Sequence, residues 1–180
     1  MNKIIAIVGM CGSGKSVASE LLENMGYQKV YFGGVTMEKL KEKGLEVTPE
    51  NEKMMREKLR EDLGMGAFAK ILLPKIKELS ATENVVLDGL YSWDEYKILD
   101  EEFGKQMSTI AIICDKKMRY NRLKVRETRP LTKKEANARD LSEIENIAKA
   151  PPIAYADYFI FNNGTLEEYK KRLEEILRQI

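Results

Sequence analysis

The chain has 180 residues, 43% of them hydrophobic, which suits one well-buried domain and argues against two independent ones. Its 30 Lys and Arg residues balance 29 Asp and Glu residues, so the formal net charge of +1 gives no reason to expect nucleic acid or an anionic membrane as a partner. The absence of histidine excludes His-based general-base catalysis and His-containing metal sites.

The first element is predicted at residues 4–8, a continuous, mostly β-branched run that is typical of a strand buried on both faces. The next residues, 9–16, fit the phosphate-binding pattern G-x-x-x-x-G-K-[ST] without a mismatch. Val17, Leu21 and Leu22 then recur at helical spacing. A strand before the motif and a helix after it are the context that a P-loop requires.

The residue types in this loop have a chemical explanation. Glycines allow positive φ, so that successive N–H groups can turn inward around a phosphate at the start of a helix. Lys15 would reach the β- and γ-phosphates of ATP, and the Ser16 hydroxyl would ligate Mg²⁺. The alternative is a glycine-rich turn with a solvent-facing lysine. The predicted nucleotide-binding residues in this segment are Gly9, Cys11, Gly12, Ser13, Gly14, Lys15, Ser16 and Val17.

Strand and helix patterns alternate over the rest of the chain. Further strands are predicted at residues 29–32, 84–88, 108–114 and 158–161. Helices are predicted at 35–43, after Thr48, after Gly66, after Ser92, after Asp115 as a cap, from Thr132 to about Ala148, and after Thr165. This alternation predicts an α/β P-loop NTPase fold with a five-stranded, mostly parallel sheet flanked by helices and a ligand at the strand C-terminal ends.

We expect residues 1–180 to form a single P-loop kinase domain, with an acceptor-binding helical insertion at about 34–80 and a short helical lid at about 119–140. The two cysteines, Cys11 and Cys114, form no disulfide framework, and a cysteine in a phosphate loop suits a reducing compartment. No run approaches the roughly 20 apolar residues of a membrane span, and the first apolar run is too short for a signal peptide. We therefore expect a cytoplasmic protein with no membrane partner.

Asp88 follows the buried run 85–87 directly, where a carboxylate can hold the shell of a magnesium ion beside the P-loop. It is the predicted second metal residue and, if the acceptor must lose a proton, the predicted base. The alternative is an ordinary Asp-Gly turn.

A basic segment is the third candidate feature. Arg119, Arg122 and Arg126 are three and four residues apart, so on a helix they fall near one face, and Arg129 and Arg139 follow. Planar guanidinium groups can bind two oxygens of a transferred phosphoryl group, which favours a catalytic lid, although Arg119 is the weakest member. The alternative is a solvated surface helix.

With these features the chain resembles the P-loop nucleotide and nucleoside kinases, in particular dephospho-CoA kinase and adenylate kinase. It is most similar to an uncharacterised, mainly archaeal adenylate-kinase-related group. The resemblance is carried by the P-loop, residues 86–90, Arg122-x-x-x-Arg126, Arg139-Asp140 and residues 156–164. It implies ATP- and Mg²⁺-dependent phosphoryl transfer, with Arg122 stacking on adenine.

The resemblance also assigns roles outside the P-loop. It implies that Arg126, Arg129 and Arg139 gather phosphate charge, and that the turn containing Asn163 and Gly164 lies against the nucleotide base. From the residues alone that turn is an ordinary loop and helix cap.

Departures from the family pattern lie on the acceptor side. Gly33-Gly34 stands where the family usually has an acid, and Met37 and Tyr91 stand where related chains have arginines. Arg60 resembles a surviving acceptor-side arginine, although a surface position on an amphipathic helix would explain it equally.

The sequence therefore favours a small-molecule kinase that transfers the γ-phosphoryl group of ATP to a nucleotide, nucleoside or dephospho-CoA-like acceptor, as a monomer or homodimer without a nucleic-acid partner. The alternative is an ATP-binding regulatory protein with a degenerate acceptor site. A GTPase is disfavoured because no Asn-Lys-x-Asp segment is present, and an ABC-type or AAA+ motor is disfavoured by size.

Overall fold

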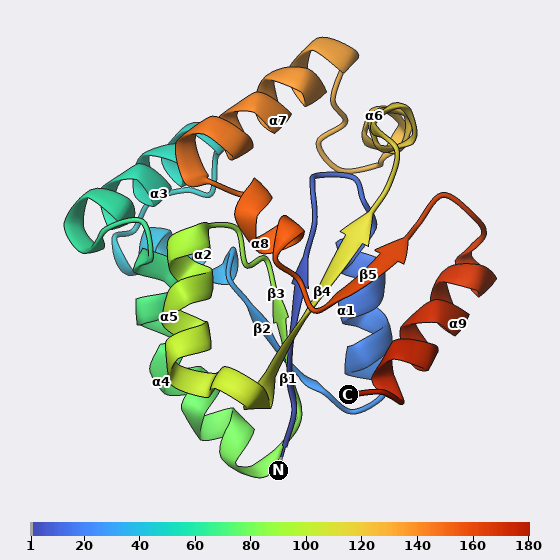
Figure 1. Ribbon diagram of the computed structural model, residues 1–180. Coiled ribbons are helices and arrows are strands. Elements are labelled where there is room, and N and C mark those ends of the chain that lie inside the picture. The colour runs from blue at the N-terminus through green and yellow to red at the C-terminus, as the bar shows by residue number, and fades with distance from the viewer. Residues whose placement is uncertain (1) are drawn as a thin grey trace.

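The computed structural model describes residues 2–180 and has a five-stranded sheet at its centre (Figure 1). Its strands lie in the order β2-β3-β1-β4-β5, and every pairing is parallel. The strands are β1 (Ile4–Val8), β2 (Gln28–Tyr31), β3 (Val85–Asp88), β4 (Met107–Ile113) and β5 (Tyr158–Phe161). The predicted α/β P-loop fold with five strands is confirmed, and the sheet is wholly parallel.

Helices cover both faces of this sheet. They are α1 (Lys15–Asn24), α2 (Gly34–Glu42), α3 (Pro49–Leu63), α4 (Ala67–Thr82), α5 (Trp93–Phe103), α6 (Lys116–Val125), α7 (Lys133–Ile147), α8 (Ala150–Ala154) and α9 (Leu166–Leu177), with a 3₁₀ turn at Gly104–Gln106. In Figure 1, α1 and α9 lie on one side of the sheet, α4 and α5 on the other, and α7 crosses above the strand ends. The predicted lid segment contains α6 and the first half of α7.

Two apolar cores follow from the alternation of side chains along each strand. Ile5 and Ile7 of β1 pack with α1 and α9, including Leu22 and Leu173. Ile4, Ala6 and Val8 face the opposite core, which is built mainly from α2, α3, α4 and α5. Because all five side chains of β1 are buried, its sequence is continuously apolar rather than alternating.

The order of the strands fixes where a ligand can bind. The chain leaves β1 toward β2 on one side and leaves β3 toward β4 on the other, so the crevice between β1 and β3 is the switch point of the sheet. Ile7 of β1 lies in register with Asp88 of β3. The P-loop and the predicted magnesium carboxylate therefore meet at this crevice.

The starts of the predicted helices were within a residue or two of the structure, and the caps explain why, whereas α8 was not predicted. Thr48, Ser92, Thr132 and Thr165 each accept a hydrogen bond from a backbone N–H in the first turn of their helix, as the sequence predicts. Asp115 is the exception: it lies at the cap position of α6, but its side chain makes no capping hydrogen bond.

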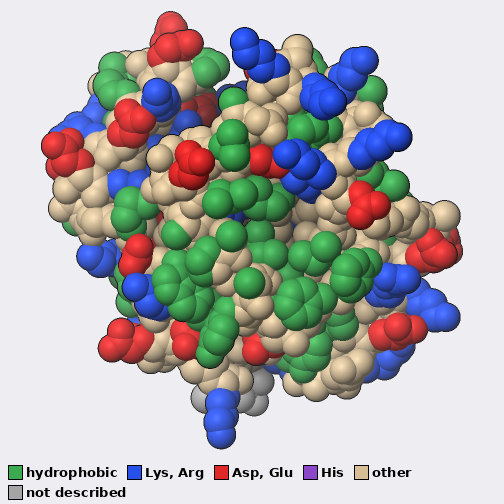
Figure 2. All heavy atoms as spheres, turned by 45° about the horizontal axis from the view of Figure 1, so that its top comes forward, with side chains coloured by type: hydrophobic (Ala, Val, Ile, Leu, Met, Phe, Trp, Pro, Cys, Tyr) green, Lys and Arg blue, Asp and Glu red, His purple; other side chains and the backbone are tan. Residues whose placement is uncertain are grey.

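β5 is an edge strand, and the side chains of two of its residues, Phe159 and Phe161, are exposed. Figure 2 shows hydrophobic side chains gathered across the middle of this view and basic ones toward its upper right.

No helix among residues 2–180 combines the length and the apolar character needed to cross a membrane.

Candidate nucleotide-binding site

The P-loop connects β1 to α1 and has the backbone that the sequence predicts. Gly9, Gly12 and Gly14 have φ values of 147°, 79° and 102°. A Cβ atom on Gly9 would come within 2.6 Å of the Ile112 carbonyl oxygen, and one on Gly12 within 2.9 Å of the Arg119 carbonyl oxygen. Only glycine fits these positions, because both the backbone conformation and the surrounding space exclude a side chain.

Side chains from distant parts of the chain hold this loop from outside. Asn162 Nδ2 donates to the Ser13 carbonyl at 2.8 Å, and Tyr169 Oη donates to the Gly14 carbonyl at 3.0 Å. A guanidinium nitrogen of Arg119 donates to the Cys11 carbonyl at 2.8 Å. With these carbonyls turned outward, the arrangement favours N–H groups that face a phosphate at the start of α1.

Lys15 is the first residue of α1, and its side chain folds back over the loop. Its Nζ donates to the Met10 carbonyl at 3.1 Å. Burial, followed by the positive charge of Lys149, lowers the pKa of Lys15 to about 7. Such a lysine gains most from an anion that restores its charge. Ser16 beside it is exposed, so its hydroxyl can reach a ligand.

Asp88 lies at the end of β3, next to the P-loop. Burial raises the pKa of its carboxyl group, while the charges of Lys29, at 3.8 Å, and Lys15 act in the opposite direction. Mg²⁺ in phosphoryl-transfer sites is typically bound by one or two protein oxygens together with phosphate and water. The Ser16 hydroxyl and the Asp88 carboxylate, which were predicted to hold Mg²⁺, are oxygen donors of the type that such sites use.

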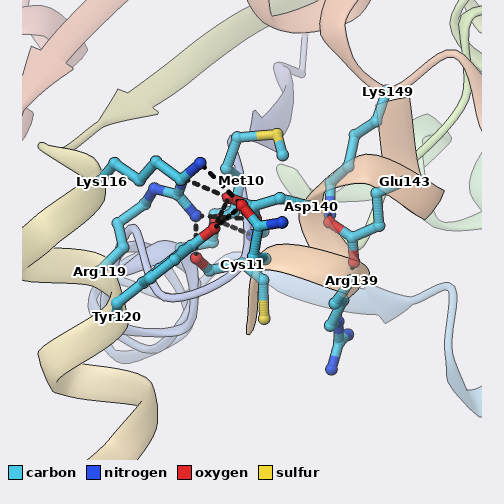
Figure 3. A network of polar contacts seen from close by, with 11 residues as sticks. Met10, Cys11, Lys116, Arg119, Tyr120, Arg139, Asp140, Glu143 and Lys149 are labelled. Atoms are coloured by element: carbon cyan, nitrogen blue, oxygen red, sulfur yellow. Dashed lines mark hydrogen bonds and ion pairs between the residues drawn. The ribbon is translucent and has the colours of Figure 1, made fainter. Parts of the chain in front are cut away.

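The structure separates the five arginines of the basic segment. Arg119 points inward: its guanidinium binds both oxygens of the Asp140 carboxylate, at 3.0 and 2.6 Å, and both side chains are only 7% exposed. Tyr120 Oη also donates to Asp140, at 3.1 Å (Figure 3). Arg119 therefore joins α6 to α7 and to the P-loop, and its place on the arginine face does not make it a phosphate ligand.

Arg122 lies at the opposite side of the loop from Asp88. Its guanidinium donates to the Asn162 carbonyl at 3.1 Å and to Cys114 Sγ at 3.3 Å. Asn163 Oδ1 accepts a hydrogen bond from the Asp115 N–H at 3.0 Å, and Gly164 follows in the exposed turn. The structure thus brings Arg122, Asn163 and Gly164 together at the ends of β4 and β5, where they could hold a nucleotide base.

Arg126 and Arg129 have partners away from the P-loop. Arg129 binds the carboxylate of Glu52 on α3, at 2.6 and 3.2 Å, and Arg126 Nε donates to the Arg129 carbonyl. The carboxylate of Glu52 is buried, and its hydrogen bonds with Arg129 hold its pKa below the ordinary value. Arg129 therefore ties the predicted lid to the predicted acceptor-binding helices, and Arg126 supports the loop that carries Arg129.

Arg139 belongs to a group of charged residues that the sequence does not reveal. Its Nε donates to Glu143 Oε1 at 3.0 Å, and Lys149 Nζ donates to Glu143 Oε2 at 2.6 Å. Figure 3 shows these three residues on one side of Met10 and Cys11, with Arg119 and Tyr120 on the other. Both hydrogen bonds are local, four and six residues apart, but the residues match no recognised motif, and the contact of Lys149 with Tyr91 joins this group to a distant segment.

The acceptor side differs from expectation at one residue. Arg60 lies with its guanidinium over the ring of Phe68, 5.2 Å from the centroid, and burial lowers its pKa. Arg60 is thus half-buried against α4 and not a freely exposed surface residue. Gly34 begins α2, Met37 is exposed, and the ring of Tyr91 lies 4.6 Å from Lys149 Nζ.

The chain is similar to a group of known proteins over most of its length. The model of a family described as "AAA domain" matches residues 5–146. A "UPF0200 protein" of Thermococcus onnurineus is 35% identical, with 98% of this chain and 97% of that protein covered. A "UPF0200 protein" of Sulfurisphaera tokodaii is 37% identical, with 99% and 97% covered.

Solved structures share the fold at lower identity. TT1252 from Thermus thermophilus gives a TM-score of 0.65 at 21% identity, with 99% of this chain and 98% of that chain covered. Shikimate kinase from Acinetobacter baumannii, in complex with shikimate, gives 0.63 at 15% identity, with 99% and 93% covered. Shikimate kinase from Bacteroides thetaiotaomicron gives 0.62 at 13% identity, with 98% and 97% covered.

Proposed function

Since this chain belongs to the UPF0200 family of P-loop kinase-like proteins, we propose that it is an ATP- and Mg²⁺-dependent phosphotransferase that moves the γ-phosphoryl group of ATP to a small-molecule acceptor. The observation that carries this proposal is the placement of Lys15 and Asp88 together at the sheet's switch point. We place the nucleotide base on the β4 and β5 side of that point and the acceptor on the β3 side.

In this proposal the P-loop binds the phosphates of ATP and stabilises the charge that develops during transfer. Its glycines let the backbone approach the phosphates closely, and Lys15 places a positive charge where negative charge develops during transfer. Ser16 and Asp88 would hold a magnesium ion and its water shell, which would neutralise charge on the β- and γ-phosphates. Asp88 would also accept the acceptor's proton where one must be removed.

The arginines divide between the two ends of the nucleotide. Arg122 holds the base side together with Asn163 and Gly164. Arg126, Arg129 and Arg139 supply charge to the transferred group, and for Arg129 this requires release from Glu52. Phosphoryl transfer depends mainly on positioning and charge stabilisation, so these groups need no histidine base.

The proposed acceptor belongs to one class of small molecules: a nucleotide, a nucleoside or a dephospho-CoA-like molecule. The fold shared with shikimate kinases and with a "sugar kinase" of Janibacter supports a small hydroxyl-bearing acceptor. We further propose a cytoplasmic protein that acts as a monomer or homodimer in one kinase domain, residues 1–180, with its acceptor-binding insertion at about 34–80.

The second candidate is an ATP-binding regulatory protein. It is favoured by the acceptor side, where Gly34, Met37 and Tyr91 replace charged residues expected from the resemblance. This protein would bind Mg·ATP without transferring a phosphoryl group to any metabolite.

An assay of ADP release with Mg·ATP and a panel of nucleosides, nucleoside monophosphates, dephospho-CoA and shikimate separates the two candidates. We expect one acceptor to drive ADP release, and Lys15→Ala to lower that rate by about 100-fold or more with an unchanged melting temperature. Lys171→Ala, which alters an exposed lysine of α9, is the matched control. Full activity of Lys15→Ala would refute the mechanism, whereas tight Mg·ATP binding without transfer would favour the regulatory protein.

A further inference from the structure

Lys149 is the most deeply buried cation at the mouth of the P-loop. It lies between α7 and α8 and is 2% exposed. Its Nζ has one carboxylate partner, Glu143, at 2.6 Å, and lies 4.6 Å from the centroid of the Tyr91 ring. Removing an ammonium group from water costs free energy, so such a group is kept where nearby anions or aromatic faces stabilise it.

The charges around Lys149 do not balance. Glu143 is shared, because its two oxygens accept hydrogen bonds from Lys149 and from Arg139. Lys15 adds a third positive charge when it is protonated, and it lies close enough for Lys149 to lower its pKa; the nearby carboxylate of Asp88 already faces Lys29. This corner of the crevice therefore carries more positive than negative charge, which favours an anionic ligand.

The position of Lys149 shows which ligand it would meet. The base side of the site is marked by Arg122, which binds the Asn162 carbonyl beyond β5. Lys149 instead lies against Tyr91, which follows the end of β3 on the other side of β1. An anion held by Lys149 would thus enter from the side of β3 and α3, opposite to the base.

We propose that Lys149 and Arg139 form an anion subsite for the phosphoryl acceptor, next to the transferred group that Arg139 also contacts, that Glu143 holds both cations while the subsite is empty, and that the acceptor is a phosphomonoester. This inference rests on the proposed function. A phosphate group offers three terminal oxygens, enough for the ammonium and the guanidinium together. Arg139 is 44% exposed, so its guanidinium can turn from Glu143 toward a ligand.

A purely structural role for the same residues predicts something different. The Lys149 N–H also donates to the Glu143 carbonyl, at 3.1 Å, which closes the end of α7. If the side-chain pair only fastened this turn, its removal would change stability and leave anion binding alone. The test therefore needs an anion-binding measurement.

Inorganic phosphate is the probe, titrated at constant ionic strength against protein saturated with Mg·AMPPNP so that the P-loop is occupied. We expect saturable binding to the wild type, at least tenfold weaker binding to Lys149→Met, and unchanged binding to Lys133→Met, which alters an exposed lysine at the start of α7. Glu143→Gln should bind phosphate several-fold more tightly, because a competing carboxylate is gone. A merely structural pair would not produce that gain.

The double variant Lys149→Met with Glu143→Gln removes both charges, so it keeps the test valid if the single variant fails to fold, and it should also lose phosphate binding. Equal phosphate binding by the wild type and the Lys149 variants, or no saturable binding by the wild type, would overturn the proposal. Acetate that binds as tightly as phosphate would overturn the phosphomonoester class. Failure of this inference leaves Mg·AMPPNP binding intact, whereas a wild type that binds no Mg·AMPPNP would refute the proposed function and this inference with it.

Discussion

Arg129 binds Glu52 across 77 residues of sequence, at 2.6 Å between a guanidinium nitrogen and a carboxylate oxygen. The carboxylate is 9% exposed and the guanidinium 54%, so the pair closes the surface between α3 and the loop that precedes α7. It holds the predicted lid against the predicted acceptor-binding insertion. The phosphate role proposed for Arg129 is available only when this pair opens.

Replacing Glu52 by Gln should loosen the loop at residues 126–131. A half-exposed ion pair of this kind is worth about 1 kcal/mol, which corresponds to a roughly fivefold larger open population. Limited trypsin digestion should therefore cut after Arg126 about five times faster. Glu57→Gln, which alters an exposed ion pair with Lys53 on the same helix, is the control, and equal digestion of the two variants would contradict the role of Glu52.

The buried pair of Arg119 and Asp140 should matter for stability. Arg119→Met leaves the Asp140 carboxylate buried without its cation, which should lower the free energy of unfolding by about 3–5 kcal/mol. Adding Asp140→Leu should recover much of that loss in urea unfolding. ATP affinity should stay reduced in the double variant, because the Cys11 carbonyl still lacks its donor. A double variant no more stable than the single one would show that the charge is not the cause.

Asn162 and Asn163 are neighbours with different predicted effects. Asn162→Ala removes the hydrogen bond to the Ser13 carbonyl inside the protein, so it should weaken Mg·ATP binding about tenfold, as expected for a lost buried contact of about 1–2 kcal/mol. Asn163→Ala alters an exposed residue and should weaken binding less. Calorimetric titration of both variants with Mg·AMPPNP measures the difference. The idea fails if Asn163→Ala has the larger effect.

Nucleotide binding should take up a proton above pH 7. The pKa of Lys15 is lowered to about 7 by burial and by Lys149, so at pH 8 about nine tenths of its side chains are neutral before a ligand binds. Phosphates restore the charged form, so binding at pH 8 should take up about 0.9 proton and weaken as the pH rises further. Titration calorimetry in buffers of different ionisation enthalpy measures this uptake. It should disappear in Lys15→Ala, and uptake that persists there would assign the proton to another group.

The fold and the centre of the site were predictable because their signals are local. The buried run of β1, the glycines of the P-loop and the acid that ends β3 are each read within a few residues. The parallel pairing of β1 with β3 then places Asp88 beside the loop, as expected from the order of a doubly wound sheet.

The surrounding residues could not be predicted because long-range contacts assign their roles. Spacing on α6 put Arg119 with the other arginines, yet only its contact with Asp140 shows that it points inward. Glu52 has no motif around it, and its partner Arg129 lies 77 residues away, in the loop before α7. Lys149 pairs with Glu143 only six residues away, but its contact with Tyr91 is long-range. Asp115 likewise occupies the N-cap position of α6, as predicted, but its side chain makes no capping hydrogen bond.

α7 is bracketed by backbone that only glycine adopts without strain. Arg129, in the loop before the helix, has φ 54° and Ala148, directly after it, has φ 49°; among residues 2–180 these are the two non-glycine residues with positive φ. Each such residue stores on the order of 1 kcal/mol that folding alone would avoid by using glycine. The helix that bears the network beside the P-loop thus has a locally strained backbone in the loop before it and at the residue that follows it.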